Sequence, residues 1–109
     1  RLSNRKRWVA FSTPVRGTIT INDGAKLMVI ENGKSLLPAG ITDVSGTFQA
    51  GDLVSIVDIE GNNLARGFAN YSALEIRQIK GLKTSEIERI LGYKDFDEVV
   101  HRDNLVLGV

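Results

Sequence analysis

The chain has 109 residues and a mass of 11.9 kDa, which is the size of one ordinary domain. Hydrophobic residues make up 42% and charged residues 25%, so the chain is too apolar to be disordered as a whole, and its formal net charge is only +1. The absence of cysteine excludes disulfides and thiolate chemistry, and the absence of any run of about 18 apolar residues predicts no membrane-spanning helix.

The charge is distributed unevenly along the chain. Residues 1–16 carry five basic and no acidic side chains, whereas residues 17–109 carry nine basic and thirteen acidic ones, a net charge of −4. A net negative body is a poor electrostatic footprint for binding nucleic-acid phosphates. We therefore predict that residues 1–16 form a basic linker and that residues 17–109 form the folded domain.

Part of the linker combines positive charge with an aromatic ring. The residues concerned are Arg5, Lys6, Arg7 and Trp8. Such a group can contact phosphates and stack on a base. It also suits a connector that packs its ring on a neighbouring domain, and we favour this second interpretation.

The first elements of the domain are expected to be a strand and a short helix. Residues 17–21 alternate polar and apolar side chains, which predicts a half-buried strand. Asp23 can cap a helix over residues 24–32, and Gly33 stands where a left-handed C-terminal residue belongs. A loop over residues 34–40 follows the helix.

Three further strands are expected in the middle of the chain. They are rich in branched and aromatic residues and cover residues 41–48, 53–58 and 64–71. Turn residues at 50–52 and 60–63 separate them. The short turn at 60–63 predicts that the strands on either side of it pair as an antiparallel hairpin.

Two short helices are expected after the hairpin. Residues 72–75 (SALE) have the spacing of a capping box and predict a helix that ends at Gly81. Residues 85–88 (SEIE) repeat this spacing, and Gly92 ends the second helix.

The elements together indicate a fold class. Apolar residues at 99–100 and 105–107 suit a strand that returns to the sheet. Short strands, glycine-rich turns and small helices predict a mainly β fold with short α-helices, in a barrel-like arrangement of mixed strands. A fully parallel sheet would need regularly alternating crossover helices, which this pattern lacks.

Two motifs suggest nucleotide chemistry, and each lacks an essential residue. Gly33-Lys34-Ser35 resembles the end of a phosphate-binding loop, but Met28 stands where the first glycine of that loop belongs. Residues 101–103 (HRD) match part of a protein-kinase catalytic loop, but Gly108 replaces its asparagine. We predict that neither motif is catalytic.

Residues for metal binding and nucleophilic catalysis are few. His101 is the single histidine, and one imidazole without cysteine cannot assemble the usual zinc ligands. The acidic turn at Asp95, Asp97 and Glu98 lacks the glycine and the later bidentate acid of a calcium loop. We therefore expect no catalytic residue, metal or cofactor in this chain.

Several sequence blocks nevertheless resemble a known family. GTITINDGA (residues 17–25), GKSLLPAGI (33–41), FQAGD (48–52) and ARGFANYS (65–72) together resemble PUA domains, small pseudo-barrel modules found in pseudouridine synthases and archaeosine transglycosylases. The tail over residues 85–104, with ILGY (90–93) and EVVHRDN (98–104), is similar to the C-terminal PUA domain of bacterial glutamate 5-kinases. The resemblance extends over nearly the whole chain.

The resemblance implies a PUA-type pseudo-barrel and a parent enzyme that uses ATP to phosphorylate the side-chain carboxylate of glutamate, the first step of proline biosynthesis. ATP and Mg²⁺ would bind to an amino-acid-kinase domain upstream of Arg1. The PUA domain itself would modulate proline feedback inhibition, metal dependence or assembly. The resemblance also implies a cytoplasmic homo-oligomer with no membrane contact.

PUA domains that bind RNA use the first helix and the loop after it. The resemblance therefore implies a nucleic-acid face at Asp23, Gly24, Ala25, Lys26, Gly33, Lys34, Ser35, Leu36 and Leu37. Only Lys26 and Lys34 are basic, and two lysines neutralise about two phosphates, which is a weak and salt-sensitive hold. A PUA fold without RNA binding is thus favoured, and an RNA-binding module is the alternative.

Overall fold

A computed structural model of the chain describes residue 10 and residues 12–108, which contain a five-stranded sheet with the strand order β2-β1-β3-β4-β5. The strands are β1 (Gly17–Ile21), β2 (Ile41–Gly46), β3 (Leu53–Val57), β4 (Asn63–Phe68) and β5 (Leu105–Leu107). β1 pairs in antiparallel with β2 and in parallel with β3, and the remaining neighbours are antiparallel. This mixed sheet confirms the predicted fold class and the predicted hairpin of β3 and β4.

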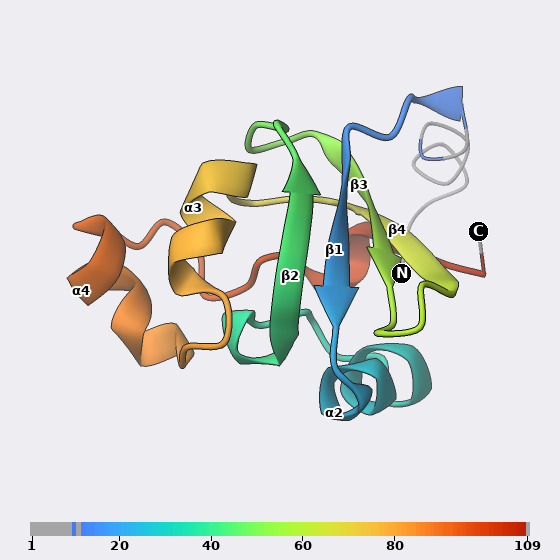
Figure 1. Cartoon of the computed structure of the whole chain (residues 1–109), viewed down its shortest axis with the longest axis horizontal. Helices are drawn as coiled ribbons and strands as arrows, with labels where there is room; N and C mark the ends of the chain where they lie inside the picture. The colour runs from blue at the N-terminus through green and yellow to red at the C-terminus, as the bar shows by residue number, and fades with distance from the viewer. Residues whose placement is uncertain (1–9, 11, 109) are drawn as a thin grey trace.

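Short helices lie at the end and along the edge of the sheet. The α-helices are α2 (Asp23–Lys26), α3 (Ala73–Ile79) and α4 (Ile87–Leu91). A π-helical segment η1 (Leu27–Glu31) continues α2, and the 3₁₀ turns are η2 (Pro38–Gly40), η3 (Thr84–Glu86) and η4 (Arg102–Asn104). Figure 1 shows α2 at the carboxyl end of β1, and α3 and α4 beyond the β2 edge of the sheet.

Alternation along β1 directs its apolar side chains into the core. Ile19 and Ile21 are fully buried, while the threonines between and before them are half-buried on the other face. The pairing with β2 shifts between Thr20 and Ile21, so that Ile41 and Val44 of β2 both reach the same core. Because of this bulge, β2 buries both Ile41 and Val44 on the same face, although they are three residues apart.

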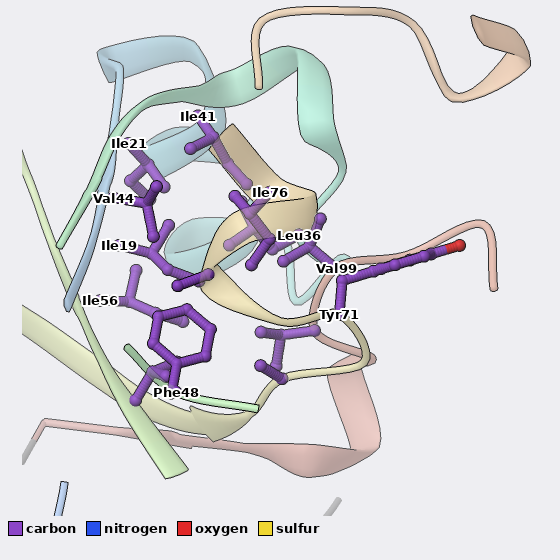
Figure 2. Packing of buried hydrophobic residues seen from close by; sticks show 14 of the residues in the cluster. Ile19, Ile21, Leu36, Ile41, Val44, Phe48, Ile56, Tyr71, Ile76 and Val99 are labelled. Atoms are coloured by element: carbon purple, nitrogen blue, oxygen red, sulfur yellow. The ribbon is translucent and has the colours of Figure 1, made fainter. Parts of the chain in front are cut away.

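The main core lies between the sheet, α3 and the segment near residue 100. Figure 2 shows Ile19, Ile56, Phe48 and Ile76 converging there from the strands, a loop and α3. The ring of Tyr71 is also buried, but its hydroxyl points away from these side chains and donates to the Phe96 carbonyl oxygen at 2.5 Å. The core therefore holds the 93–98 segment as well as the sheet.

Three predicted strands end earlier than the sequence indicates. β2 ends at Gly46, whose φ of +99° turns the chain away before Phe48. β3 ends before Asp58, because that carboxylate accepts the N–H groups of the following turn. β4 ends at Phe68. The backbone N–H of the next residue, Ala69, donates to the Asp52 carbonyl oxygen in the turn before β3 instead of to a neighbouring strand.

The two predicted capping boxes have different outcomes. Ser72 and Glu75 exchange both side chain to backbone hydrogen bonds, so the first box is confirmed. The second is wrong, because Ser85 lies inside the 3₁₀ turn η3 and α4 begins at Ile87 without a side-chain cap. A residue in helical backbone cannot take the extended conformation that a cap requires. Gly92, with φ of +87°, ends α4 as predicted.

The two C-terminal apolar segments do not form one strand. Residues 105–107 form β5, whereas Val100 makes an isolated antiparallel bridge with Leu36. The turn η4 separates them. Both valines at 99–100 are nevertheless fully buried, so this segment closes the core beneath the 34–40 loop.

Candidate functional site

The candidate site begins where β1 ends. Asn22 has extended backbone, and its Oδ1 accepts the N–H of Ala25 at 2.8 Å. Asn22 is therefore the N-cap of α2, and the prediction that Asp23 fills this role is wrong. Asp23 already lies in the first turn, where its negative charge suits the positive end of the helix. Gly33 takes the predicted left-handed conformation, with φ of +65°.

A cavity of about 300 Å³ opens between α2, η1 and the 34–40 loop. It is lined by Asn22, Gly24, Ala25, Met28, Val29, Lys34, Ser35, Leu36, Leu37, Ala39 and Gly40. Six of the nine residues of the implied nucleic-acid face therefore meet at one hollow: Gly24, Ala25, Lys34, Ser35, Leu36 and Leu37. Asp23, Lys26 and Gly33 do not line it.

Residues missed by the sequence analysis complete the cavity. Met28 and Val29 follow Ala25 at helical spacing, so the apolar face of the predicted helix was the signal for them. Gly40 had no such signal, since its importance lies in a contact with α2. A Cβ added at Gly40 would lie 2.3 Å from the Cβ of Ala25, so the absence of a side chain allows the close approach of η2 to α2.

The polar groups around the cavity mostly bond within the domain. Ser35 Oγ accepts the N–H of Arg102 at 2.8 Å, which ties the loop to η4. The Lys34 N–H donates to the Met28 carbonyl oxygen, and the Leu36 N–H donates to Val100. These bonds leave the cavity with an apolar wall and few polar groups to offer a ligand.

Lys26 faces a buried carboxylate outside the cavity. Its Nζ lies 3.2 Å from Asp58 Oδ2, and the Asp58 side chain is only 2% exposed. Burial acts to raise the pKa of Asp58, but hydrogen bonds from Asn62, Lys26 and Glu60 outweigh it and lower the pKa from 3.8 to about 2. The carboxylate thereby ties α2 to the β3–β4 turn. It also pairs with one of the two lysines that the family resemblance implies for RNA binding.

Asp58 gives the stability of the domain a specific pH dependence. The folded-state pKa lies below the ordinary value, so the stabilisation is fully present above pH 3.8 and is lost as the pH falls towards about 2. We expect Asp58→Asn to lower the urea midpoint at pH 7, and the midpoints of the two proteins to converge between pH 4 and 2. Parallel midpoint curves across that range would contradict this account.

The other motifs form local structure. Nδ1 of His101 accepts the N–H of Asp103 at 3.1 Å and caps η4. In the acidic turn, Asp97 pairs with Lys94 at 3.2 Å. No cluster of three histidine, aspartate or glutamate side chains that could hold a metal is found in residues 10 and 12–108. None of the helices formed by these residues is long and apolar enough to cross a bilayer.

The end of the predicted linker packs against the sheet. Ala10 is buried with Leu53 and Val106, and its carbonyl oxygen accepts a hydrogen bond from Arg66 Nη1 at 3.2 Å. The Arg16 N–H donates to the Leu53 carbonyl oxygen at 2.8 Å. The predicted contact group of Arg5, Lys6, Arg7 and Trp8 lies outside the described residues.

Comparisons with known sequences place this chain in a family. The PUA domain family matches residues 17–91. Over 97% of its length, the chain is 55% identical to glutamate 5-kinase from Syntrophus aciditrophicus, and over 98% it is 54% identical to that from Moorella thermoacetica. The chain spans only 28% of the length of these two curated relatives.

Solved structures agree on the fold. A conserved PUA domain protein from Thermoplasma acidophilum matches with a TM-score of 0.53 and 25% identity, over 66% of this chain and 47% of that one. A PUA domain from Aeropyrum pernix K1, determined as a tartrate complex, matches with a TM-score of 0.58 and 17% identity, over 79% of this chain and 41% of that one.

Proposed function

The chain belongs to the PUA domain family, and on that premise we propose that it is the non-catalytic C-terminal PUA domain of a glutamate 5-kinase. The parent enzyme would transfer a phosphoryl group from ATP to the side-chain carboxylate of L-glutamate. The PUA domain would modulate proline feedback inhibition, metal dependence or assembly of that enzyme.

One observation carries this proposal. The chain is 50–56% identical to glutamate 5-kinases over at least 96% of its own length, including the tail beyond the family match at residue 91. The match to glutamate 5-kinases therefore includes the segment that closes the core near residue 100. This segment lies outside the residues that match the PUA domain family in general.

The proposal assigns the chemistry to other residues of the parent enzyme. ATP and Mg²⁺ would bind to its amino-acid-kinase domain, and no residue of this chain is assigned to either. The partner of the PUA domain is then the kinase domain of the same polypeptide, within a cytoplasmic homo-oligomer.

Removal of the domain tests the proposed role. We expect a full-length enzyme truncated before Gly17 to keep glutamate phosphorylation, while its half-inhibiting proline concentration shifts by about 5-fold or more, the lower range of allosteric coupling. Phosphorylation across a proline titration, with circular dichroism as the folding control, measures this. Coincident proline curves would contradict a regulatory role, and a folded but inactive enzyme would contradict the non-catalytic assignment.

RNA binding is the alternative function, and it has less support. Lys34 stands at the cavity, but Lys26 is engaged by Asp58, so the implied face offers one free cation instead of two. One phosphate contact contributes a salt slope of only about one and little affinity. An RNA affinity in low salt that falls steeply as salt is added would favour this alternative.

A further inference from the structure

The face of the sheet opposite to the main core is partly covered by the chain before β1. Val54, Ala65 and Leu105 belong to the main core, so the residues next to them point to the opposite face. The strand register places the side chains of four residues next to one another on this face: Leu53, Phe68, Arg66 and Val106. Ala10 and Val15 pack against Leu53 and Val106, which are both fully buried.

The entry segment, residue 10 with residues 12–16, contains a helical carbonyl group that lacks a donor from its own helix. Ala10 and Ser12 both have helical backbone. In an α-helix the Ala10 carbonyl oxygen would accept the N–H of residue 14, but Pro14 has no N–H. Arg66 Nη1 on β4 donates to this oxygen instead, at 3.2 Å. The guanidinium thus supplies the hydrogen bond that the sequence of the entry segment cannot make.

Packing alone does not explain an arginine at this position. Arg66 Nε is buried and has no hydrogen-bond partner among the described residues. An unpaired buried donor lowers stability, whereas an apolar side chain would suit the neighbouring Phe68 and Val106 on this face. The bond to Ala10 is what the arginine adds. Its particular contribution is therefore to hold the entry segment, not to pack the sheet.

The entry segment is attached at both ends. Ala10 is held by Arg66 and by the apolar cluster around Leu53. At the other end, the Arg16 N–H donates to the Leu53 carbonyl oxygen at 2.8 Å, and Val15 packs on the same cluster. A segment fixed at both ends cannot pivot at the start of β1, as a flexible linker would. The direction in which the chain enters the sheet is therefore set by the fold.

We propose that Arg66 anchors the entry segment and thereby joins the PUA domain rigidly to the kinase domain of the parent enzyme. The inference rests on the proposed function, and it names the connection through which the PUA domain acts on proline inhibition. Arg66 is a positioning residue, because it acts through the backbone of Ala10. A rigid connection lets a change of orientation in one domain reach the other, whereas a flexible linker does not transmit it.

Hydrogen exchange in the full-length enzyme tests the anchoring. Arg66→Met keeps an unbranched apolar side chain and removes the guanidinium. We expect peptides that span residues 10–16 to exchange about 10-fold faster in this variant, because a hydrogen bond from a charged group no longer holds the segment closed. Peptides within β3 should keep their slow exchange, which is the control for folding.

Arg89→Met is the matched control variant. It also removes one arginine and one hydrogen bond, from Arg89 Nε to Glu86 at 2.6 Å. Arg89 lies on α4, beyond the β2 edge of the sheet and remote from β4 (Figure 1). The exchange of residues 10–16 should therefore be the same as in the unaltered enzyme.

A proline titration of the same variants tests the coupling. Arg66→Met should shift the half-inhibiting proline concentration in the same direction as truncation before Gly17, by about 5-fold. Arg66→Lys, which keeps a charged donor, should shift it less, and Arg89→Met should leave it unchanged.

Two results would overturn the inference. Unchanged exchange of residues 10–16 in Arg66→Met would show that Arg66 does not anchor the entry segment. Faster exchange with an unchanged proline curve would show that the anchored segment does not couple the domains. If truncation shifts the proline curve in either case, only this connection is wrong, whereas a truncation without effect means that the proposed function itself fails.

Discussion

Phe48→Ala is expected to lower the free energy of unfolding by about 3–5 kcal/mol, the usual effect of removing a buried phenylalanine. Phe48 is 2% exposed and lies beside Ile56 in the main core (Figure 2). Its loss removes apolar burial and leaves a cavity that the sheet cannot fill by collapsing. Since small domains are stable by only about 5–15 kcal/mol, urea unfolding should show a large shift in midpoint.

Leu74→Ala is the matched control for that experiment. Leu74 is 70% exposed, so its truncation should change the unfolding free energy by less than about 0.5 kcal/mol. Equal midpoints for the two variants would show that Phe48 is not part of the stabilising core.

Gly17→Ala is the second variant with a large expected effect, a loss of about 1–3 kcal/mol through overpacking. An added Cβ would lie 2.4 Å from Phe48 Cδ2 and 2.5 Å from the Ser45 carbonyl oxygen. The second contact is with the backbone of β2, so β1 and β2 would have to separate at the Gly17–Gly46 pair. Urea unfolding measures the loss.

A glycine in an open position provides the comparison. At Gly24 in α2, the nearest atom to an added Cβ is Asn22 Oδ1, at 3.5 Å. Gly24→Ala should therefore be neutral or stabilise the domain by up to about 1 kcal/mol, because alanine favours the helix. A destabilisation at Gly24 as large as that at Gly17 would contradict the steric explanation.

Some local features of the fold could be predicted from the sequence, although the equally local capping box at residues 85–88 could not. The capping box at Ser72 and Glu75 depends on residues three apart, and Gly33 and Gly92 end their helical segments through their own backbone conformation. The alternation in β1 likewise needs only neighbouring residues. These signals are short-range, so no knowledge of the tertiary structure was required.

The features that depend on distant partners could not be predicted in this way. The parallel pairing of β1 with β3 and the isolated bridge of Leu36 to Val100 join separate segments. The Lys26–Asp58 pair joins residues 32 apart, and neither side chain marks the other in the sequence. Asn22 and Asp23 can both accept an N–H, and only the start of α2 decides between them.

The candidate site was predicted in part, and for a different reason. The resemblance implied nine residues, of which Gly24, Ala25 and Lys34 are among those that line the cavity. The apolar character of the cavity and the ion pair of Lys26 with Asp58 depend on packing and burial, which the sequence does not show directly. Family resemblance therefore indicated the region, whereas the packing around the cavity determines what chemistry it can accept.

The bridge between Leu36 and Val100 also bears on how the domain folds. It closes a long loop, and the entropy lost on closure precedes the contacts that compensate for it. The domain should accordingly fold at the slower rates of sheet proteins with distant contacts, not at those of small helical bundles. During synthesis on the ribosome, the apolar faces of β1 and β3 therefore stay incompletely covered until the valines at 99–100 emerge, because all of these side chains share one core.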